Sequence, residues 1–214
     1  MTVNEFQNIE QGSEAWRRLR AGKATASRIK DVIAKTKSGP AATRANYLTE
    51  LVIERLTGVK EEGFTNGFMA WGTDQEPEAR RRYESEKGIL VQEIGFVDHP
   101  TIPMSGASPD GLVGSEGILE IKCPSTKTHI ETLLADTIPP QYVAQVQWQM
   151  ACTQRAWCDF VSFDPRMPEN AQFFCVRVNA DFDYIKTLEE EVVKFLAEVE
   201  ETIKQLNRRF KCTV

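Results

Sequence analysis

Two short stretches decide the fold of this 214-residue chain: Ser-Pro-Asp-Gly-Leu at residues 108–112 and Leu-Glu-Ile-Lys-Cys-Pro at residues 119–124. Side chains alternate faces along an extended strand, so Glu120 and Lys122 should project to one side while their apolar neighbours point into the core. A short glycine-containing turn between the stretches could return the chain and place Asp110 beside Glu120. Two carboxylates would then hold Mg²⁺, or Mn²⁺ in its place, next to an ammonium group.

An aspartate followed ten positions later by Glu-x-Lys is the arrangement of a metal-dependent nuclease. Phosphodiester hydrolysis needs a metal that lowers the pKa of bound water from 15.7 toward roughly 7 and neutralises the phosphate oxygens, and a cation that orients or deprotonates that water. Lys122 is the candidate for this cation. A bare Glu-x-Lys triplet also occurs in hairpins that carry one surface salt bridge, but the flanking turn and apolar strand favour the catalytic interpretation.

Other segments extend the pattern along the chain. They are, in order, Glu10-Gln11-Gly12, Ala15-Trp16, Leu19-Arg20, Thr25-Ala26-Ser27, Trp71-Gly72 with Glu76, and Ala144-Gln145-Val146-Gln147. Together with the two stretches above, they resemble the phage lambda exonuclease family of YqaJ-type viral recombinases and alkaline exonucleases over residues 9–180. The resemblance implies an α/β (α+β) fold with a PD-(D/E)xK restriction-endonuclease-like core, in which a central mixed β-sheet is flanked by helices.

The resemblance also implies an activity and partners. The expected enzyme is a Mg²⁺-dependent, ATP-independent 5′-to-3′ exonuclease that degrades one strand of double-stranded DNA from its ends and releases 5′-mononucleotides. No G-x-x-x-x-G-K-[ST] motif occurs, in agreement with ATP independence. A homotrimeric ring would enclose the DNA, and the remaining 3′ tail would pass to a single-strand annealing recombinase protein in phage-type recombination.

The resemblance assigns roles around the metals. Asp110, Glu120 and the backbone carbonyl of Ile121 would be metal ligands, at a site for two ions. Glu76 would bind the second ion or its waters, although it could also be a solvated helix glutamate. Gln145 would bind the nucleophilic water or the scissile phosphate.

Four further residues match family positions that form a pocket for the 5′-terminal phosphate: Arg20, Thr25, Ser27 and Ser108. A guanidinium fork, hydroxyl donors and a helix N-terminus together suit a dianion. Ser27 could also be the N-cap of a helix over residues 28–34. Both roles can coexist.

Composition indicates one soluble domain spanning residues 1–214. The chain is 41% hydrophobic and 27% charged, enough for one sizeable core. It has no long apolar run and no apolar leader, so we expect a cytoplasmic protein without a membrane segment. The five cysteines include no C-x-x-C pair, which argues against a disulfide framework, a zinc site or an iron–sulfur cluster.

Charge is distributed unevenly about a net value of −5. Residues 17–44 contain nine basic residues and one acidic residue, whereas residues 181–201 contain eight acidic and two basic residues. This pattern predicts an electrically polar molecule with a basic face for DNA phosphates, although such runs are often solvated surface.

Periodicity and turn residues predict the elements. Helices are expected at 13–19 with a serine cap, 28–34, 45–56, 67–86 with a kink or late start at Pro77, 140–152 and 184–206, the last packed on its own sheet. Strands are expected at 89–97, 104–107, 117–123, 157–163 and 173–178, with a mobile loop at 35–44.

Two alternatives remain open. A restriction-type endonuclease uses the same carboxylate and lysine core but cuts inside a duplex. A noncatalytic DNA-end-binding module would need no intact catalytic set, and the presence of Asp110, Glu120 and Lys122 argues against it.

Overall fold

The computed structural model describes residues 9–37, 39–60 and 67–210. Its centre is a five-stranded sheet in the order β10-β9-β8-β7-β4. In chain order these strands are β4 (Val91–Gln92), β7 (Gly111–Val113), β8 (Gly117–Lys122), β9 (Trp157–Phe163) and β10 (Phe173–Asn179). β8 and β9 run parallel, and the other neighbouring pairs in this order are antiparallel. The predicted central mixed sheet is therefore confirmed.

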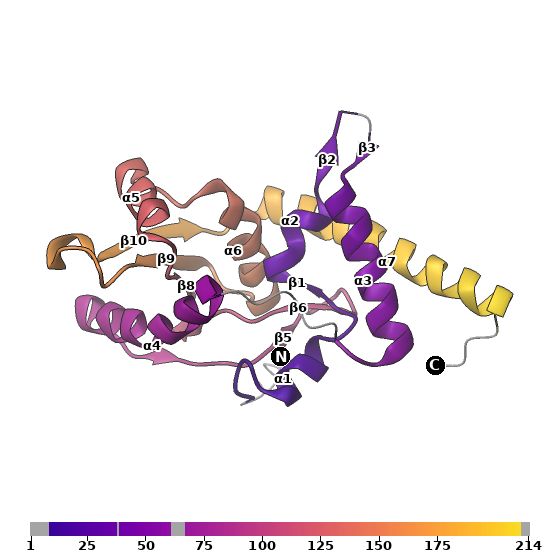
Figure 1. Ribbon diagram of the computed structural model, residues 1–214, viewed down its shortest axis with the longest axis horizontal. Coiled ribbons are helices and arrows are strands. Elements are labelled where there is room, and N and C mark those ends of the chain that lie inside the picture. Colours follow the sequence, from indigo (N-terminus) through magenta and orange to yellow (C-terminus); the bar gives the residue numbers. More distant parts are fainter. Residues whose placement is uncertain (1–8, 38, 61–66, 211–214) are drawn as a thin grey trace.

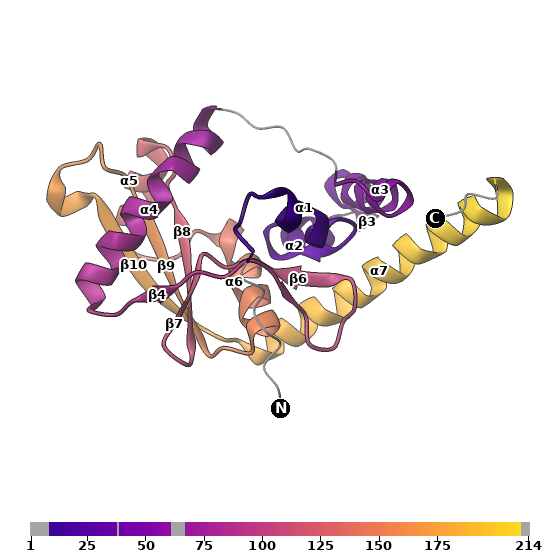
Figure 2. The ribbon, with the colours of Figure 1, turned by 90° about the horizontal axis from the view of Figure 1, so that it is seen from below.

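Two helices cover the two faces of this sheet, as Figures 1 and 2 show. They are α4 (Gly67–Lys87) and α6 (Pro140–Thr153). Side-chain alternation along β8 decides which helix each residue meets. Leu119 and Ile121 pack in the apolar cluster that contains Tyr83 of α4, whereas Ile118 packs with Val146 of α6. The even-numbered side chains of β8 thus share the α6 face.

The remaining elements surround this layered core. In chain order they are α1 (Glu14–Arg20), β1 (Ala24–Thr25), a 3-10 helix η1 (Ala26–Arg28), α2 (Ile29–Val32), β2 (Lys35–Thr36), β3 (Gly39–Pro40), α3 (Ala42–Thr57), β5 (Val97–Asp98), β6 (Ser105–Ala107), α5 (Thr126–Ala135), a 3-10 helix η2 (Glu169–Ala171) and α7 (Phe182–Phe210). β1, β6 and β5 form a small second sheet in that order. This sheet brings the segment after α1 next to the segment that leads into Asp110.

The long C-terminal helix α7 is amphipathic, as predicted, but it does not pack on the sheet. Its apolar face, with Leu188, Phe195 and Val199 fully buried, lies against α2, α3 and α6. Phe195 stacks on Tyr47 of α3 with ring centroids 5.4 Å apart. Figures 1 and 2 show α7 running along one side of the molecule beside α3. The predicted packing of this helix on the sheet was therefore wrong.

Several other expected elements were wrong in detail. The single strand over 89–97 is two short strands, β4 and β5, that belong to different sheets. The short turn expected between the two stretches, with Gly111 and Gly114 in it, includes strand β7, and the loop over 35–44 contains the β2–β3 hairpin and the start of α3. Helix α4 runs through Pro77 from residue 67, so the late start was wrong. Helix α5 was not predicted.

The expected cap at Ser27 was also wrong. The chain enters η1 already at Ala26, with Thr25 as its N-cap, and that cap makes no side-chain hydrogen bond. Ser27 lies inside the turn with its side chain exposed. The cap at Ser13 is confirmed, because its side chain accepts a hydrogen bond from the backbone of Trp16.

Two basic residues of the N-terminal segment form ion pairs with the acidic helix α7. Arg44 of α3 makes two hydrogen bonds to Glu198 of α7, at 2.7 and 2.8 Å. Lys35 pairs with Glu191 of α7 in the same way, at 3.2 Å. These two ion pairs join the basic and acidic segments of the chain, and the basic face expected from the sequence stays a prediction.

Other expectations concern cysteines and membranes. The described cysteines, Cys123, Cys152, Cys158 and Cys175, are free, and Cys212 lies outside the described residues. Within residues 9–37, 39–60 and 67–210, none of the helices combines the length and apolarity of a membrane span.

Candidate active site

Asp110 lies where the sequence placed it, beside Glu120 at the start of the β7–β8 pair. Its backbone N–H donates to the carbonyl of Leu119 at 3.0 Å, and its Oδ2 accepts from the backbone N–H of Ile121 at 2.6 Å. The following residue has to be glycine, because a Cβ at Gly111 would lie 2.1 Å from Cγ1 of Val91. The Asp-Gly pair thus lets strand β4 approach closely while the carboxylate is fixed to β8.

Glu120 is almost completely buried, with 1% of its surface exposed. Its Oε1 forms an ion pair with Nζ of Lys122 and accepts a hydrogen bond from Nε2 of Gln145 on α6. Its Oε2 accepts from Nε2 of Gln149, one turn further along α6, at 2.6 Å. Both oxygens of this carboxylate are therefore held by side chains from β8 and α6, and Gln145 reaches the site as predicted.

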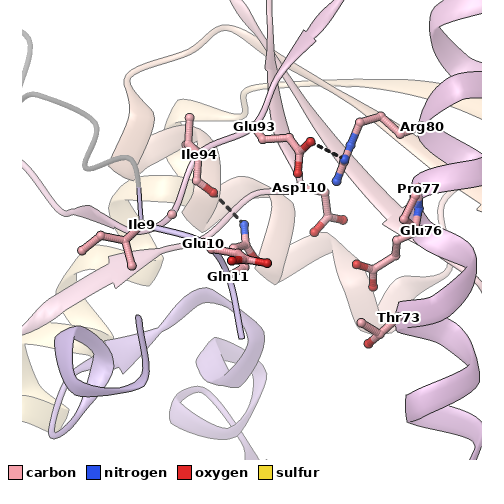
Figure 3. A pocket seen from close by; sticks show the side chains of 11 residues that line it. Ile9, Glu10, Gln11, Thr73, Glu76, Pro77, Arg80, Glu93, Ile94 and Asp110 are labelled. Carbon is pink, nitrogen blue, oxygen red and sulfur yellow. Dashed lines mark hydrogen bonds and ion pairs between the residues drawn. The ribbon is translucent and has the colours of Figure 1, made fainter. Parts of the chain in front are cut away.

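Glu76 of α4 adds a third carboxylate. Figure 3 shows Glu76 and Asp110 pointing into the same cavity. Burial, followed by the charge of Glu120, raises the pKa of Asp110 well above its usual range, and Glu76 adds to this rise. Burial likewise raises the pKa of Glu76, against the opposing charge of Lys122. The carboxylates are crowded enough to favour binding of a proton or a metal cation.

Lys122 is the compensating cation. Burial alone would lower the pKa of Lys122, but the charges of Glu120 and Asp110 outweigh it and raise the pKa above its usual value. Nζ also lies 5.3 Å from the ring centroid of Tyr142, a cation–π distance. The side chain is therefore held as an ammonium group at the edge of the site.

Two cavities adjoin Glu76. One, of about 440 Å³, is lined by Glu10, Gln11, Arg80 and Glu93 as well as by Asp110 (Figure 3). The other, of about 390 Å³, is lined by Trp71, Lys122 and Tyr142. The catalytic candidates thus stand between a carboxylate-rich hollow and a hollow with two aromatic rings.

Gln11 closes one wall of the first cavity. Its Nε2 donates to the carbonyls of Ile94 and Pro109, each at 2.9 Å. Since Pro109 precedes Asp110, this contact fixes the N-terminal segment to the turn that carries the carboxylate. The Glu10-Gln11-Gly12 segment therefore has a structural role at the site.

The donor set fits a hard divalent cation only in part. Among the described residues, no three His, Cys, Asp or Glu side chains converge closely enough to hold a metal by themselves. Mg²⁺ commonly binds through one or two carboxylates and keeps several waters, so Asp110 and Glu120 would be sufficient with the Ile121 carbonyl. The raised pKa of Asp110 reflects the repulsion that such a cation would relieve.

A second cluster lies next to this one, around Arg20. Its guanidinium stacks 3.8 Å from the centroid of Trp16, whose Nε1 donates to Oγ of Ser108 at 2.9 Å. Burial lowers the pKa of Arg20 to about 10, because Tyr47 and Glu54 only partly offset it. Its Nε is buried without a partner, and no carboxylate in the described part of the chain forms an ion pair with Arg20. A partly buried guanidinium that forms no ion pair has the chemistry to bind an anion.

The other two residues expected at this pocket are placed less directly. Thr25 lies on β1, which pairs with β6 just before Ser108, but its backbone N–H donates to the hydroxyl of Tyr47 at 3.1 Å. Its side chain is buried. Ser27 is exposed and makes none of the side-chain contacts that join Arg20, Trp16 and Ser108. The structure thus joins Arg20 to Ser108 through Trp16, and leaves the roles of Thr25 and Ser27 as predictions.

Comparison with known proteins identifies the family. Residues 15–156 match the model of the YqaJ-like viral recombinase domain. The chain belongs to this family. Two crystal structures of LHK-Exo are 51% identical in sequence with a TM-score of 0.87, covering 92% of this chain and 97% of theirs. One is described as an alkaline exonuclease from Laribacter hongkongensis and the other as its complex with dAMP.

A more distant structure shares the fold. A phage-related exonuclease from Haemophilus somnus is 16% identical with a TM-score of 0.67, covering 89% of this chain and 99% of that one. This YqaJ-like viral recombinase therefore has the fold of phage exonucleases, as expected for a PD-(D/E)xK core. A search of curated proteins gives no significant match.

The site includes three residues to which the sequence analysis gave no role. Gln149 contacts Glu120, Trp16 joins Arg20 to Ser108, and Arg80 lines the first cavity. Gln149 follows Gln145 by four positions, a spacing that places both on one helix face. That spacing was the available signal for Gln149. Arg80 follows Glu76 by the same interval.

Proposed function

We propose that this YqaJ-like viral recombinase is a Mg²⁺-dependent, ATP-independent deoxyribonuclease that degrades one strand of double-stranded DNA from the 5′ end and releases 5′-mononucleotides. The observation that carries the proposal is the convergence of Asp110, Glu120 and Lys122 at the β7–β8 pair, with Glu76 facing them from α4. Similar proteins described as exonucleases, one of them in complex with a deoxynucleoside monophosphate, support the same activity.

Each residue has a chemical role in this proposal. Asp110, Glu120 and the Ile121 carbonyl would hold one cation, and Glu76 would hold a second ion or its waters. When bound, such a cation neutralises phosphate oxygens and lowers the pKa of water. Lys122 would place its positive charge beside the attacking water and the scissile phosphate, where charge develops during hydrolysis.

Gln145 would contribute hydrogen bonds from an uncharged amide. Its amide now donates to Glu120, and it can instead donate to a phosphate oxygen or accept from the attacking water. A neutral amide does this without adding charge to the site. Substrate binding and metal ligation would therefore share the α6 face of β8.

The direction of digestion would follow from the Arg20 cluster. A 5′-terminal phosphate bound by Arg20 and Ser108 would lie at a fixed distance from the catalytic carboxylates, since Ser108 precedes Asp110 by only two residues. Thr25 and Ser27 would add donors to this pocket. Cleavage one nucleotide from the end would create a new 5′-phosphate for the next cycle.

The assembly proposed for this enzyme is a homotrimeric ring around the duplex in the cytoplasm. A ring that encloses its substrate explains processive digestion without ATP. The 3′ single-stranded tail would be the substrate of a single-strand annealing recombinase protein in phage-type recombination. Family membership supports this setting.

Linear and covalently closed circular duplexes test the activity directly. With Mg²⁺, the linear duplex should release 5′-mononucleotides and leave single-stranded DNA, and the closed circle should remain intact. Chelation of the metal, or Lys122→Met, should stop digestion. Cleavage of the closed circle would instead indicate a restriction-type endonuclease, and binding of ends without digestion would indicate a noncatalytic module.

A further inference from the structure

Gln149 of α6 is fully buried, and the one hydrogen bond of its side-chain amide among the described residues goes to the candidate metal ligand Glu120. It has 0% of its surface exposed, and its Nε2 donates to Oε2 of Glu120 at 2.6 Å. Its own Oε1 is buried without a hydrogen-bond partner among the described residues. This combination requires an explanation, because a buried unpartnered carbonyl oxygen lowers the stability of a folded chain.

The two oxygens of Glu120 are held in different ways. Oε1 contacts Lys122 and Gln145, which are both partly exposed, and Lys122 lines the aromatic cavity. Oε2 accepts from Gln149 alone among the described side chains. Oε1 is thus the oxygen on the open side of the site, and Oε2 is the oxygen on the buried side.

The orientation of the amide is set by this contact. A carboxylate accepts but does not donate, so the NH₂ group of Gln149 has to face Glu120 and its oxygen has to face away. The amide oxygen of Gln149 therefore lacks a partner because the NH₂ group is turned toward Glu120. A methionine of similar size would fill the same space without burying an amide oxygen, so packing does not explain a glutamine here.

We propose that Gln149 is a positioning residue: it fixes Oε2 of Glu120 on the buried side and so presents Oε1 to the divalent cation. This inference rests on the proposed metal-dependent function. Outer contacts of this kind orient metal ligands and typically change metal affinity by about 10- to 100-fold when removed.

The same helix offers a matched control. Gln147 is also buried, with 3% exposed, but its amide donates to the carbonyl of Asn179 and accepts from the N–H of Asp181, each at 2.9 Å. Neither contact involves Glu120. Gln147→Met therefore removes a buried glutamine from α6 and should lower stability without changing the metal site.

The experiment measures Mn²⁺ binding to the full-length protein by titration calorimetry without DNA, together with the Mn²⁺ concentration that gives half-maximal digestion. Gln149→Met should weaken Mn²⁺ binding by about 10-fold or more and raise the half-maximal concentration by a similar factor. Gln147→Met should change neither. If Gln149→Met does not fold, Gln149→Asn withdraws the same amide by one methylene and serves in its place.

The outcomes separate the two proposals. Wild-type affinity in the Gln149 variant, or an equal loss in Gln147→Met, overturns the positioning role and leaves the nuclease proposal standing. A wild-type protein that binds no Mn²⁺ and digests no DNA overturns the proposed function and the positioning role with it.

Discussion

At the scale of single residues, two aspartates show how the same side chain serves opposite purposes. Burial near Glu120 and Glu76 raises the pKa of Asp110 well above its usual range. Asp159 is also buried, which would raise its pKa, but hydrogen bonds from Arg177 and Tyr83 outweigh burial and lower it. Ionisation of Asp110 thus destabilises the folded metal-free protein, whereas ionisation of Asp159 stabilises it.

Asparagine at each position tests this contrast in metal-free protein. Asp110 binds its proton more tightly when folded, so its stabilising contribution is lost as pH rises through its raised pKa. Asp110→Asn should therefore raise Tm near pH 8 by about 2–4 °C, with the gain shrinking toward pH 4. Asp159→Asn should lower Tm near pH 8, because it breaks the contacts to Arg177 at 2.8 and 2.9 Å. Stability is measured by thermal unfolding with a chelator. A lower Tm of Asp110→Asn at pH 8 would contradict the proposed repulsion between Asp110 and the neighbouring carboxylates.

Arg20 can be tested by the end that the enzyme prefers. Because its partly buried guanidinium forms no ion pair with a described residue, a 5′-phosphorylated end should be digested faster than a 5′-hydroxyl end. Arg20→Gln should slow digestion of phosphorylated ends by about 10- to 100-fold and of hydroxyl ends little. Arg18→Gln is the control, since Arg18 lies exposed on the same helix and pairs with Glu14. Equal slowing of both substrates by Arg20→Gln would place the phosphate pocket elsewhere.

The sequence predicts the catalytic candidates better than their surroundings. Strand alternation alone places Glu120 and Lys122 on one face, and the turn over residues 114–116, between β7 and β8, brings Asp110 back beside Glu120. Gln149 was not predicted: its spacing of four residues from Gln145 places both on one helix face, but that spacing does not show which side chain it contacts. Ser27 was expected as a cap because a serine before a helical pattern usually is one, but the first helical turn begins at Ala26, two residues before the expected start.

At the scale of elements, long periodic segments were predictable and short strands were not. Helices α3, α6 and α7 and strands β9 and β10 lie close to their expected bounds, because each repeats its apolar pattern several times. The segment 89–97 alternates too briefly to reveal that β4 pairs with β7 and β5 with β6. Pairing partners depend on tertiary structure, which local pattern does not contain.

The contact between α3 and α7 can be tested at Glu198. Arg44 is 8% exposed, so Glu198→Gln leaves a largely buried guanidinium without its carboxylate. Because Glu198 itself is about half exposed, we expect a loss of about 1–2 kcal/mol in the free energy of unfolding by urea. Glu201→Gln is the control, since its pair with Arg208 is exposed and 3.9 Å long. Equal small effects of both variants would show that the ion pair between Arg44 and Glu198 does not stabilise the folded protein.

At the scale of the whole molecule, charge counted along the chain cannot show which basic residues are free to bind DNA. Lys35 and Arg44 of the basic segment 17–44 form ion pairs with the acidic helix α7. The cations without ion pairs in the described part of that segment are Arg17, Arg20, Lys30 and Lys37. Contacts to DNA phosphates should therefore come from these residues rather than from the whole basic segment.

Assembly is tested by mass in solution. A homotrimer should show three times the 24.2 kDa of one chain in light scattering, with or without DNA. The reason is functional, since a closed ring keeps the enzyme on its duplex without ATP. A strict monomer at micromolar concentration would remove the ring as the cause of processivity and leave the active site as proposed.

Digestion that starts at the 5′ end and is carried out by Asp110, Glu120 and Lys122 can be followed on labelled DNA. The most direct measurement follows linear duplexes with a 5′-phosphate, labelled at either the 5′ or the 3′ end of one strand, in Mg²⁺ and beside Glu120→Gln. The 5′ label should appear first as a mononucleotide, the 3′-labelled strand should shorten progressively, and Glu120→Gln should slow both by about 10²-fold or more. Early release of the 3′ label, or digestion by Glu120→Gln at the wild-type rate, would contradict this account.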